Sequence, residues 1–474
     1  MSEEYEQLLV DLKKMSRGVD SAPQYLRHLM KMFVSDFETS MSKRLDIKFW
    51  DKLKKMMDEM QKASENDRLV DLNVQNLAVG FLTDLSLLVH YHYEIPSFGD
   101  DISTQLTFTP NIFVERKQVK SKKNCKVFMA YILLRMGDLM RYKENYPKAR
   151  EFYEQSCRIN PADGAVWNQL GLISVLSAQN LESVYYHTRA LHSTLEFPMA
   201  SGGLTNIFKK YANRDISKSM PTNELYLACL AKIHFLLEIE DFEQHTLIIS
   251  QKLATSKTML IPLMSVFEHL EEGTEIEHRA IGYIKEIWSD ACKILLKVII
   301  DRLSSSNKDV TEVSNLLHIL SLFYRASQLV PRDCEAASDA KKISELLIQS
   351  NSSGSSDIIT DSDGLRYFNC LEEQQYPLKR SELAQLLNGD VAGGNDSDEG
   401  EGEEEDQGET SIDDSSVYTT SSSKNTSKNS SPTKSPRKVQ RQLSESSDEE
   451  VLKRGRRRGK RLEESVDSEE DEDF

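Results

Sequence analysis

The stretch LRMGDLMRYKENYPKAREFYEQSCRINPADGAVWNQLG, residues 134–171, contains the internal repeat that decides the fold. Gly137 and Gly171 lie 34 residues apart, which is the period of a repeat built from two antiparallel helices. Small residues at such positions let paired helices approach closely, and Pro161 ends a helix because proline has no backbone N–H to donate. The stretch therefore predicts successive helical hairpins that pack against one another.

The sequence around these glycines matches the tetratricopeptide repeat. Trp167-Asn168-Gln169-Leu170-Gly171 fits its W-x2-L-G opening, and the preceding unit supplies Ala149, Tyr153 and Pro161 at its later positions, with Tyr in place of Phe. Repeats of this kind are binding scaffolds, so the pattern predicts a fold without naming a ligand. Two repeats also need flanking helices to cover their outer faces.

Helical periodicity continues on both sides of the repeat. Upstream, apolar residues recur every three or four positions from Leu26 to Phe37, and further helices are predicted at 47–63, 68–93 and 123–143, with a long polar loop at 95–123. Downstream, helices are predicted at 222–238, 241–256, 259–272, 276–304, 309–327 and 334–349. The segment 276–304 is apolar along one side, which is typical of a buried central helix. The predicted fold class is all-α.

The composition changes at about residue 351. Residues 351–474 contain 16 Lys and Arg against 30 Asp and Glu, so they carry −14 of the net charge of −17. A segment rich in Ser, Gly, Asp and Glu buries too little apolar surface to fold, and a disordered tail is predicted. Within it, 381–387 is predicted to form a helix on a partner. The basic run 453–461 indicates nuclear import, RNA contact or simple solvation.

The sequence contains no pattern typical of catalysis or metal binding. Its six cysteines are scattered without a Cys-x-x-Cys pair, and it has no glycine-rich phosphate loop and no nucleophile elbow. We therefore expect no enzyme activity, no cofactor and no metal. The near-neutral body, 1–350, disfavours direct nucleic-acid binding. The absence of a signal peptide and of an apolar run near 20 residues predicts no membrane association and a cytoplasmic protein, with nuclear shuttling if the basic run is used.

Basic residues in the upstream helices are the strongest candidates for a binding site. Lys54 and Lys55 follow Trp50 on one predicted helix, and Arg141-Tyr142 ends another. If the two helices line a common groove, Lys55 and Arg141 converge on a doubly charged phosphate, with Arg offering a planar fork and Lys a point charge. The alternative interpretation is that both are solvated surface residues.

The same strings resemble the Est-one/Smg family of nonsense-mediated mRNA decay adaptors. The resemblance covers about residues 20–215 and rests on Met136–Tyr142, Trp167–Leu170, Tyr185–Ala190 and Phe197–Ser201. It implies a 14-3-3-like/tetratricopeptide-like domain at 1–215, helical hairpins at 216–350 and a tail at 351–474. It also implies that the 14-3-3-like groove binds phosphorylated segments of the RNA helicase that marks messages for decay.

The resemblance further assigns roles to individual residues. Lys55, five residues after Trp50, and Arg141 correspond to phosphate-contacting residues, and Tyr142 completes an Arg-Tyr pair that is also similar to one in 14-3-3 proteins. Asn168 is a further candidate for peptide contact, with a role in tying helices together as the alternative.

Family members also pair with a sister Smg adaptor through their 14-3-3-like domains. Gly80 and Phe81 resemble a contact of that kind, and an intramolecular packing notch is the alternative. The chain looks most like the Smg-seven branch, because its tail cannot fold a PIN nuclease domain; the Smg-five branch stays open. The implied function is an adaptor that links phosphorylated helicase to a phosphatase or to deadenylase and decapping factors. The alternatives are a telomerase-associated member that binds RNA or DNA through 117–126 and the basic tail, and a plain helical scaffold.

Overall fold

The structure is a computed structural model of the chain. It describes residues 3–15, 18, 20–63, 68–94, 117–217, 219–271, 273–305, 309–325, 329, 334–351, 358–360 and 378–388. The predicted tail beyond residue 388, with its basic run at 453–461, lies outside these residues, as does the predicted loop from 95 to 116. The described residues form helices and two pairs of very short strands, which confirms the all-α prediction.

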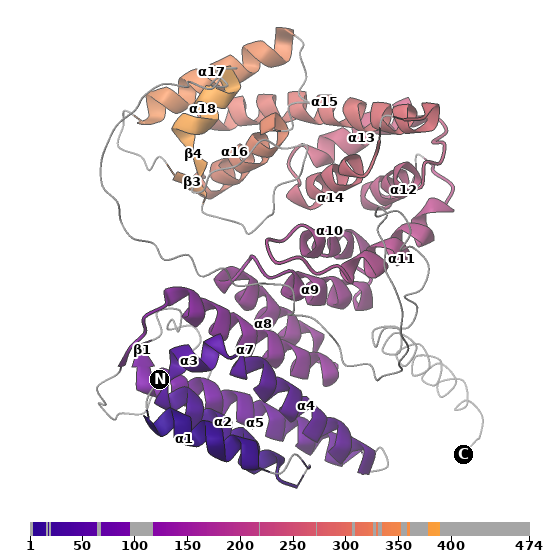
Figure 1. Ribbon diagram of the computed structural model, residues 1–474. Helices are drawn as coiled ribbons and strands as arrows, with labels where there is room; N and C mark the ends of the chain where they lie inside the picture. The colour runs from indigo at the N-terminus through magenta and orange to yellow at the C-terminus, as the bar shows by residue number, and fades with distance from the viewer. Residues whose placement is uncertain are drawn as a thin grey trace, which may run out of the picture. The chain divides into compact units, whose positions relative to one another are not determined.

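The first group of helices surrounds one apolar core, coloured indigo to purple in Figure 1. Phe33 and Phe37 pack their rings on Phe128 at centroid distances of 5.6 and 5.5 Å. Glu38 joins the start of the last helix in the group, since its carboxylate accepts the backbone N–H of Ser121 at 2.8 Å. The helices are α1 (Glu3–Lys14), α2 (Ala22–Ser35), α3 (Phe37–Ser42), α4 (Leu45–Ala63), α5 (Arg68–His92) and α7 (Lys122–Tyr142), and strand β1 (Tyr93–Glu94) pairs in parallel with β2 (Lys117–Gln118).

Helix α5 contains a stretch, Leu72–His92, that is long and apolar enough to cross a membrane by length and composition alone. The expectation that no apolar run approaches this length was therefore wrong. Its buried residues, among them Val74, Leu82 and Val89, belong to the apolar core of the first group. The stretch is accordingly a core helix of this group.

The predicted repeat forms the next four helices, which are α8 (Tyr146–Ile159), α9 (Gly164–Leu176), α10 (Asn180–Leu191) and α11 (Ala200–Ala212). Gly137 on α7 faces the ring of Tyr153 on α8 so closely that a Cβ atom there would overlap it, which explains why the first repeat position is glycine. Asn145 and Asp163 cap α8 and α9 by accepting backbone N–H groups of their first turns. Trp167 donates its indole N–H to the carbonyl of Pro161 at 2.9 Å, which fixes the turn between the two helices.

The remaining helices share a second large core. Helix α15 begins with a capping box in which Thr274 and Glu277 bond each other's backbone N–H, and its predicted apolar stripe, including Trp288 and Ile299, is buried. Figure 1 shows α15 running along the neighbouring helices. These elements are α12 (Thr222–His234), α13 (Phe242–Leu253), α14 (Lys257–Glu268), α15 (Glu275–Ser304), α16 (Val310–Arg325), α17 (Cys334–Asn351), β3 (Ile358–Thr360), β4 (Leu378–Lys379) and α18 (Arg380–Asn388).

Two features of this core differ from the predicted domain boundaries. Helices α10 and α11 contribute Val184 and Phe208 to the same core as α12–α17, so the core crosses residue 215. Helix α18 matches the predicted helix at 381–387, but it packs within its own chain: Leu383 is buried, and Ser344 on α17 donates to the carbonyl of Ala384 at 3.0 Å. The folded part therefore extends past residue 350.

Candidate functional site

Two arginines and one aspartate on α7 form a buried charge cluster, called here the arginine cluster: Arg135, Asp138 and Arg141. Their spacing of three residues places them on successive turns of the same helix. Asp138 is 2% exposed. It accepts a hydrogen bond from Arg135 Nη1 at 2.8 Å and one from the Tyr153 hydroxyl at 2.8 Å, and it lies 3.7 Å from Arg141 Nη2. One carboxylate thus holds both guanidinium groups.

Arg141 and Tyr142, both predicted as site residues, end α7. The Arg141 guanidinium lies 4.8 Å from the centre of the Tyr142 ring, and its Nε donates to the Tyr153 hydroxyl at 3.4 Å. Burial and the nearby charge of Asp138 raise the pKa of Tyr142 to about 12, so its hydroxyl stays protonated and can donate a hydrogen bond at neutral pH. Arg141 is therefore fixed by contacts with α7 and α8 before any ligand binds.

Arg135 did not figure among the predicted site residues. Its guanidinium lies 5.0 Å from the ring of Trp50 on α4 and 4.6 Å from the ring of Tyr131 on its own helix. This stacking joins α4 to α7 beside Arg141. The Arg-x-x-Asp-x-x-Arg spacing was visible in the sequence, and an i, i+3 ion pair on each side of Asp138 is the signal that could have identified it.

Lys55 lies on the exposed surface of α4, the helix that packs against α7. Its side chain is 64% exposed, and its ammonium lies 3.8 Å from the carboxylate of Glu59 one turn later. The contacts described for Lys55 stay on α4, and no hydrogen bond or ion pair joins it to Arg141 among the described residues. The structure thus puts the two predicted phosphate contacts on adjacent helices with different surroundings: Lys55 is solvated and Arg141 is held in place.

Asn168, the third predicted contact, lies in the interior of the repeat. It is 4% exposed, and its carboxamide oxygen lies 3.1 Å from Nδ1 of His187 on α10. The His187 ring fills the space above two glycines: a Cβ atom at either Gly171 or Gly203 would come within 2.7 Å of it. This geometry is consistent with the alternative considered from the sequence, in which Asn168 ties neighbouring helices together.

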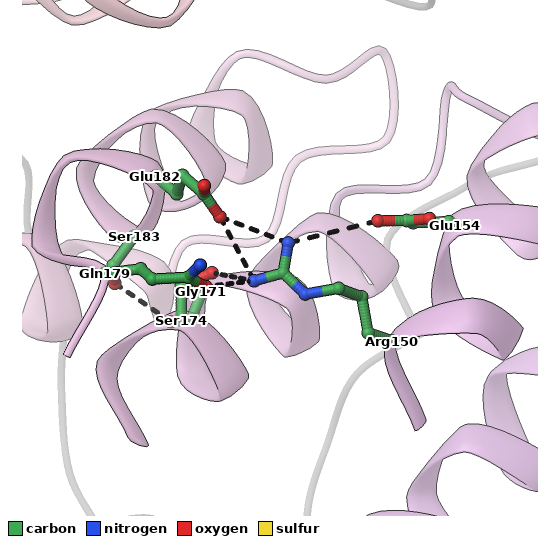
Figure 2. Close-up of polar contacts among 7 residues, drawn as sticks. All are labelled: Arg150, Glu154, Gly171, Ser174, Gln179, Glu182 and Ser183. Atoms are coloured by element: carbon green, nitrogen blue, oxygen red, sulfur yellow. Dashed lines mark hydrogen bonds and ion pairs between the residues drawn. The ribbon is translucent and has the colours of Figure 1, made fainter. Parts of the chain in front are cut away.

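Arg150 forms a second polar network, which holds the repeat together (Figure 2). From α8 its guanidinium reaches Glu182 at 3.1 Å, Gln179 at 2.6 Å and Ser174 at 3.1 Å, and Glu154 on its own helix lies 3.9 Å away. One side chain that is 24% exposed thereby connects α8 with α9 and α10. The guanidinium of Arg150 is therefore bound by side chains of its own chain.

Gly80 and Phe81, the predicted dimer contacts, differ in exposure. Phe81 is 7% exposed and belongs to the core, whereas Gly80 is exposed, with nothing within 4 Å of a Cβ atom placed on it. Leu77 and Leu88 on the same helix are 43% and 37% exposed. A mainly apolar pocket of about 180 Å³ lies between α5, α7 and α8, lined by a different set of α5 residues, among them Val79, and by Met136, Met140 and Phe152.

Within the described ranges, no group of three or more His, Cys, Asp or Glu side chains is placed to hold a metal ion. Four cysteines, Cys125, Cys157, Cys229 and Cys292, are buried and form no disulfide. The chemistry that these residues offer is therefore charge and hydrogen bonding at the arginine cluster, and apolar contact at α5.

Comparisons with known proteins identify relatives of this chain. Residues 149–362 match the family described as the Est1 DNA/RNA binding domain. The nonsense-mediated mRNA decay factor SMG7 of Danio rerio is 24% identical over 241 residues, which cover 48% of this chain and 20% of that protein. The factor SMG5 of Danio rerio is 30% identical over 143 residues, which cover 28% of this chain and 13% of that protein. The chain thus matches a fifth or less of the length of these two relatives. A solved structure of the C. elegans SMG5–SMG7 complex contains a chain 63% identical to this one, with a TM-score of 0.74, covering 82% of this chain and 98% of that one.

Proposed function

Because this chain belongs to the Est1/SMG family of nonsense-mediated mRNA decay factors, we propose that it is an adaptor that binds a phosphorylated segment of the decay helicase. The observation that carries the proposal is Arg141, a guanidinium fixed at the end of α7 beside the helix that bears Lys55. A fixed guanidinium loses little freedom on binding a phosphate, and a nearby mobile ammonium adds charge. In this proposal Asn168 does not contact the peptide but stabilises the repeat by its contact with His187.

Phosphopeptide binding tests this proposal directly. Lys55→Glu and Arg141→Gln should each weaken binding of a phosphorylated Ser-Gln peptide from the helicase by about 10- to 150-fold, because each removes a charge-assisted hydrogen bond worth roughly 1.5–3 kcal/mol. Fluorescence anisotropy with the full-length chain measures the affinity. Lys62→Glu, the same charge reversal at an exposed position further along α4, is the matched control and should bind as the wild type does. Equal affinity for the phosphorylated and unmodified peptides would contradict the proposal.

We also propose that the exposed face of α5 binds a sister adaptor to form a heterodimer. The similarity to a chain of the SMG5–SMG7 complex supports a partner of this kind. The exposed Leu77 and Leu88 lie on the same side of α5 as Gly80, whose missing side chain leaves room for a partner's helix.

A charge placed at Gly80 tests this surface. Gly80→Glu should weaken heterodimer formation by at least about 100-fold, because an unpaired carboxylate buried in an apolar interface costs several kcal/mol. The fold itself should not suffer, since a side chain there meets open space and glycine is a poor helix former. Isothermal titration with the partner gives the affinity. Gly282→Glu on α15, which also faces open space, should leave it unchanged. If the Gly80→Glu protein still bound the partner with wild-type affinity, the interface would not lie on this face of α5.

Nucleic-acid binding is the second candidate function. Its support is the match to the Est1 DNA/RNA binding domain and a set of exposed lysines from β2 to the first turns of α7, namely Lys117, Lys120, Lys122, Lys123 and Lys126. Affinity for RNA would fall steeply with salt and would not respond to peptide phosphorylation, so the same titrations separate the two functions. Under the leading proposal the protein acts in the cytoplasm and passes the helicase to a phosphatase or to deadenylase and decapping factors.

A further inference from the structure

We infer that Arg135 is a second guanidinium ligand of the bound phosphate and makes the site prefer a phosphate dianion over a carboxylate. The inference rests on the proposed function, since it assigns a further residue to the same site. The first step is the charge of the arginine cluster. Arginine stays protonated in proteins, so Arg135 and Arg141 carry two positive charges against the single negative charge of Asp138. One positive charge remains for a ligand.

The geometry makes both guanidinium groups available to a single anion. Each lies against a different oxygen of the same carboxylate, at 2.8 and 3.7 Å, so both guanidinium groups gather around Asp138. Arg135 is the more accessible, with 22% of its side chain exposed against 10% for Arg141. In this assignment, a phosphate that meets Arg141 at this surface also meets Arg135.

The aromatic rings around Arg135 determine which of its N–H groups remain for an anion. Its guanidinium carbon lies over the rings of Trp50 and Tyr131, at 5.0 and 4.6 Å from the ring centres, and its Nη1 donates to Asp138. A guanidinium held in this way offers an anion the N–H groups along its edge. Two fixed forks match the several oxygens and double charge of a phosphate better than the two oxygens and single charge of a carboxylate.

A carboxylate on α4 allows the role of charge at Arg135 to be tested. The charges of Arg135 and Lys54 both act on the Asp51 carboxyl of α4: partial desolvation raises its pKa, and these two positive charges lower it. Asp51 therefore presents a negative charge close to the guanidinium that is to bind phosphate. Removing that charge should strengthen phosphate binding, an effect that damage to the fold cannot imitate.

The test uses the full-length chain and one Ser-Gln peptide in three forms, with phosphoserine, serine or glutamate at the same position. Arg135→Gln should lower the affinity for the phosphoserine form about tenfold or more and reduce the ratio of phosphoserine to glutamate affinity. Asp51→Asn should raise the affinity for the phosphoserine form. Arg150→Gln is the matched control, because Arg150 is exposed to the same degree and is already committed to its own network; it should leave the ratio unchanged. Circular dichroism on heating confirms that each variant is folded.

The outcomes separate this inference from the function on which it rests. A wild-type protein that does not distinguish phosphoserine from serine overturns both. A wild-type protein that prefers phosphoserine, with the preference lost in Arg141→Gln but the phosphoserine-to-glutamate ratio kept in Arg135→Gln, overturns the role of Arg135 alone. An unchanged affinity in Asp51→Asn also counts against Arg135 as a ligand.

Discussion

Replacing Asp138 with asparagine is expected to lower the free energy of unfolding by about 3–5 kcal/mol. The carboxylate is 2% exposed and is shared by Arg135, Arg141 and the Tyr153 hydroxyl. An amide of the same shape leaves two largely buried guanidinium groups without their counter-charge and turns one acceptor oxygen into an N–H donor that faces them. Equilibrium unfolding in urea, followed by circular dichroism, measures the change.

The matched control for this change is Asp58→Asn on α4. Asp58 is exposed and acts on the Tyr142 hydroxyl only through its charge, so its loss should change the free energy of unfolding by no more than about 0.5 kcal/mol. If Asp138→Asn unfolded at the same urea concentration as the wild type, the arginine cluster would not depend on a counter-charge, and the fixed position of Arg141 would need another cause.

Acidification is expected to destabilise the repeat through His187. Burial lowers the pKa of this fully buried histidine to about 4, whereas in the unfolded chain it titrates near 6.5. Between these values the unfolded state binds the additional proton, so stability falls as the pH falls. At about 1.4 kcal/mol per unit, the contribution of His187 that is lost between pH 6.5 and 4 is about 3 kcal/mol.

Comparison with His187→Gln isolates that contribution. The variant lacks the titrating group, so its free energy of unfolding should fall less steeply with pH, by the equivalent of one proton. His278→Gln replaces an exposed histidine, whose Nδ1 lies 2.8 Å from the carbonyl oxygen of Thr274, and is the matched control substitution. Parallel slopes for the wild type and His187→Gln between pH 6.5 and 4 would show that His187 titrates normally in the folded protein.

The sequence predicted the helices well, because their signals are local. The 34-residue spacing from Gly137 to Gly171 identified the repeat, and the apolar stripe on α15 identified a central helix whose predicted residues are buried. The helix at 381–387 was also predicted, but its partner was not. Whether Leu383 binds another protein or packs against α17 depends on contacts between distant residues, such as Ser344 and Ala384, that no local pattern encodes.

The site was less predictable, because its geometry depends on contacts between distant residues. Arg141 was selected from a local string, yet its environment comes from Tyr153 on the next helix, and the environment of Arg135 comes from Trp50, 85 positions earlier. Asn168 looked equivalent to a surface contact until its partner, His187, was known. Periodicity shows which face of a helix is buried, but it cannot show which other helix covers that face or what charge it brings.

The fit of His187 between two glycines has a consequence for how the sequence can change over time. An alanine at Gly171 or at Gly203 is not accommodated while the imidazole fills the space above both, and a smaller residue at 187 leaves a cavity while both glycines remain. A single substitution at any of the three therefore disturbs the packing of the other two. We accordingly expect these three positions, spread over 33 residues of sequence, to change together when they change.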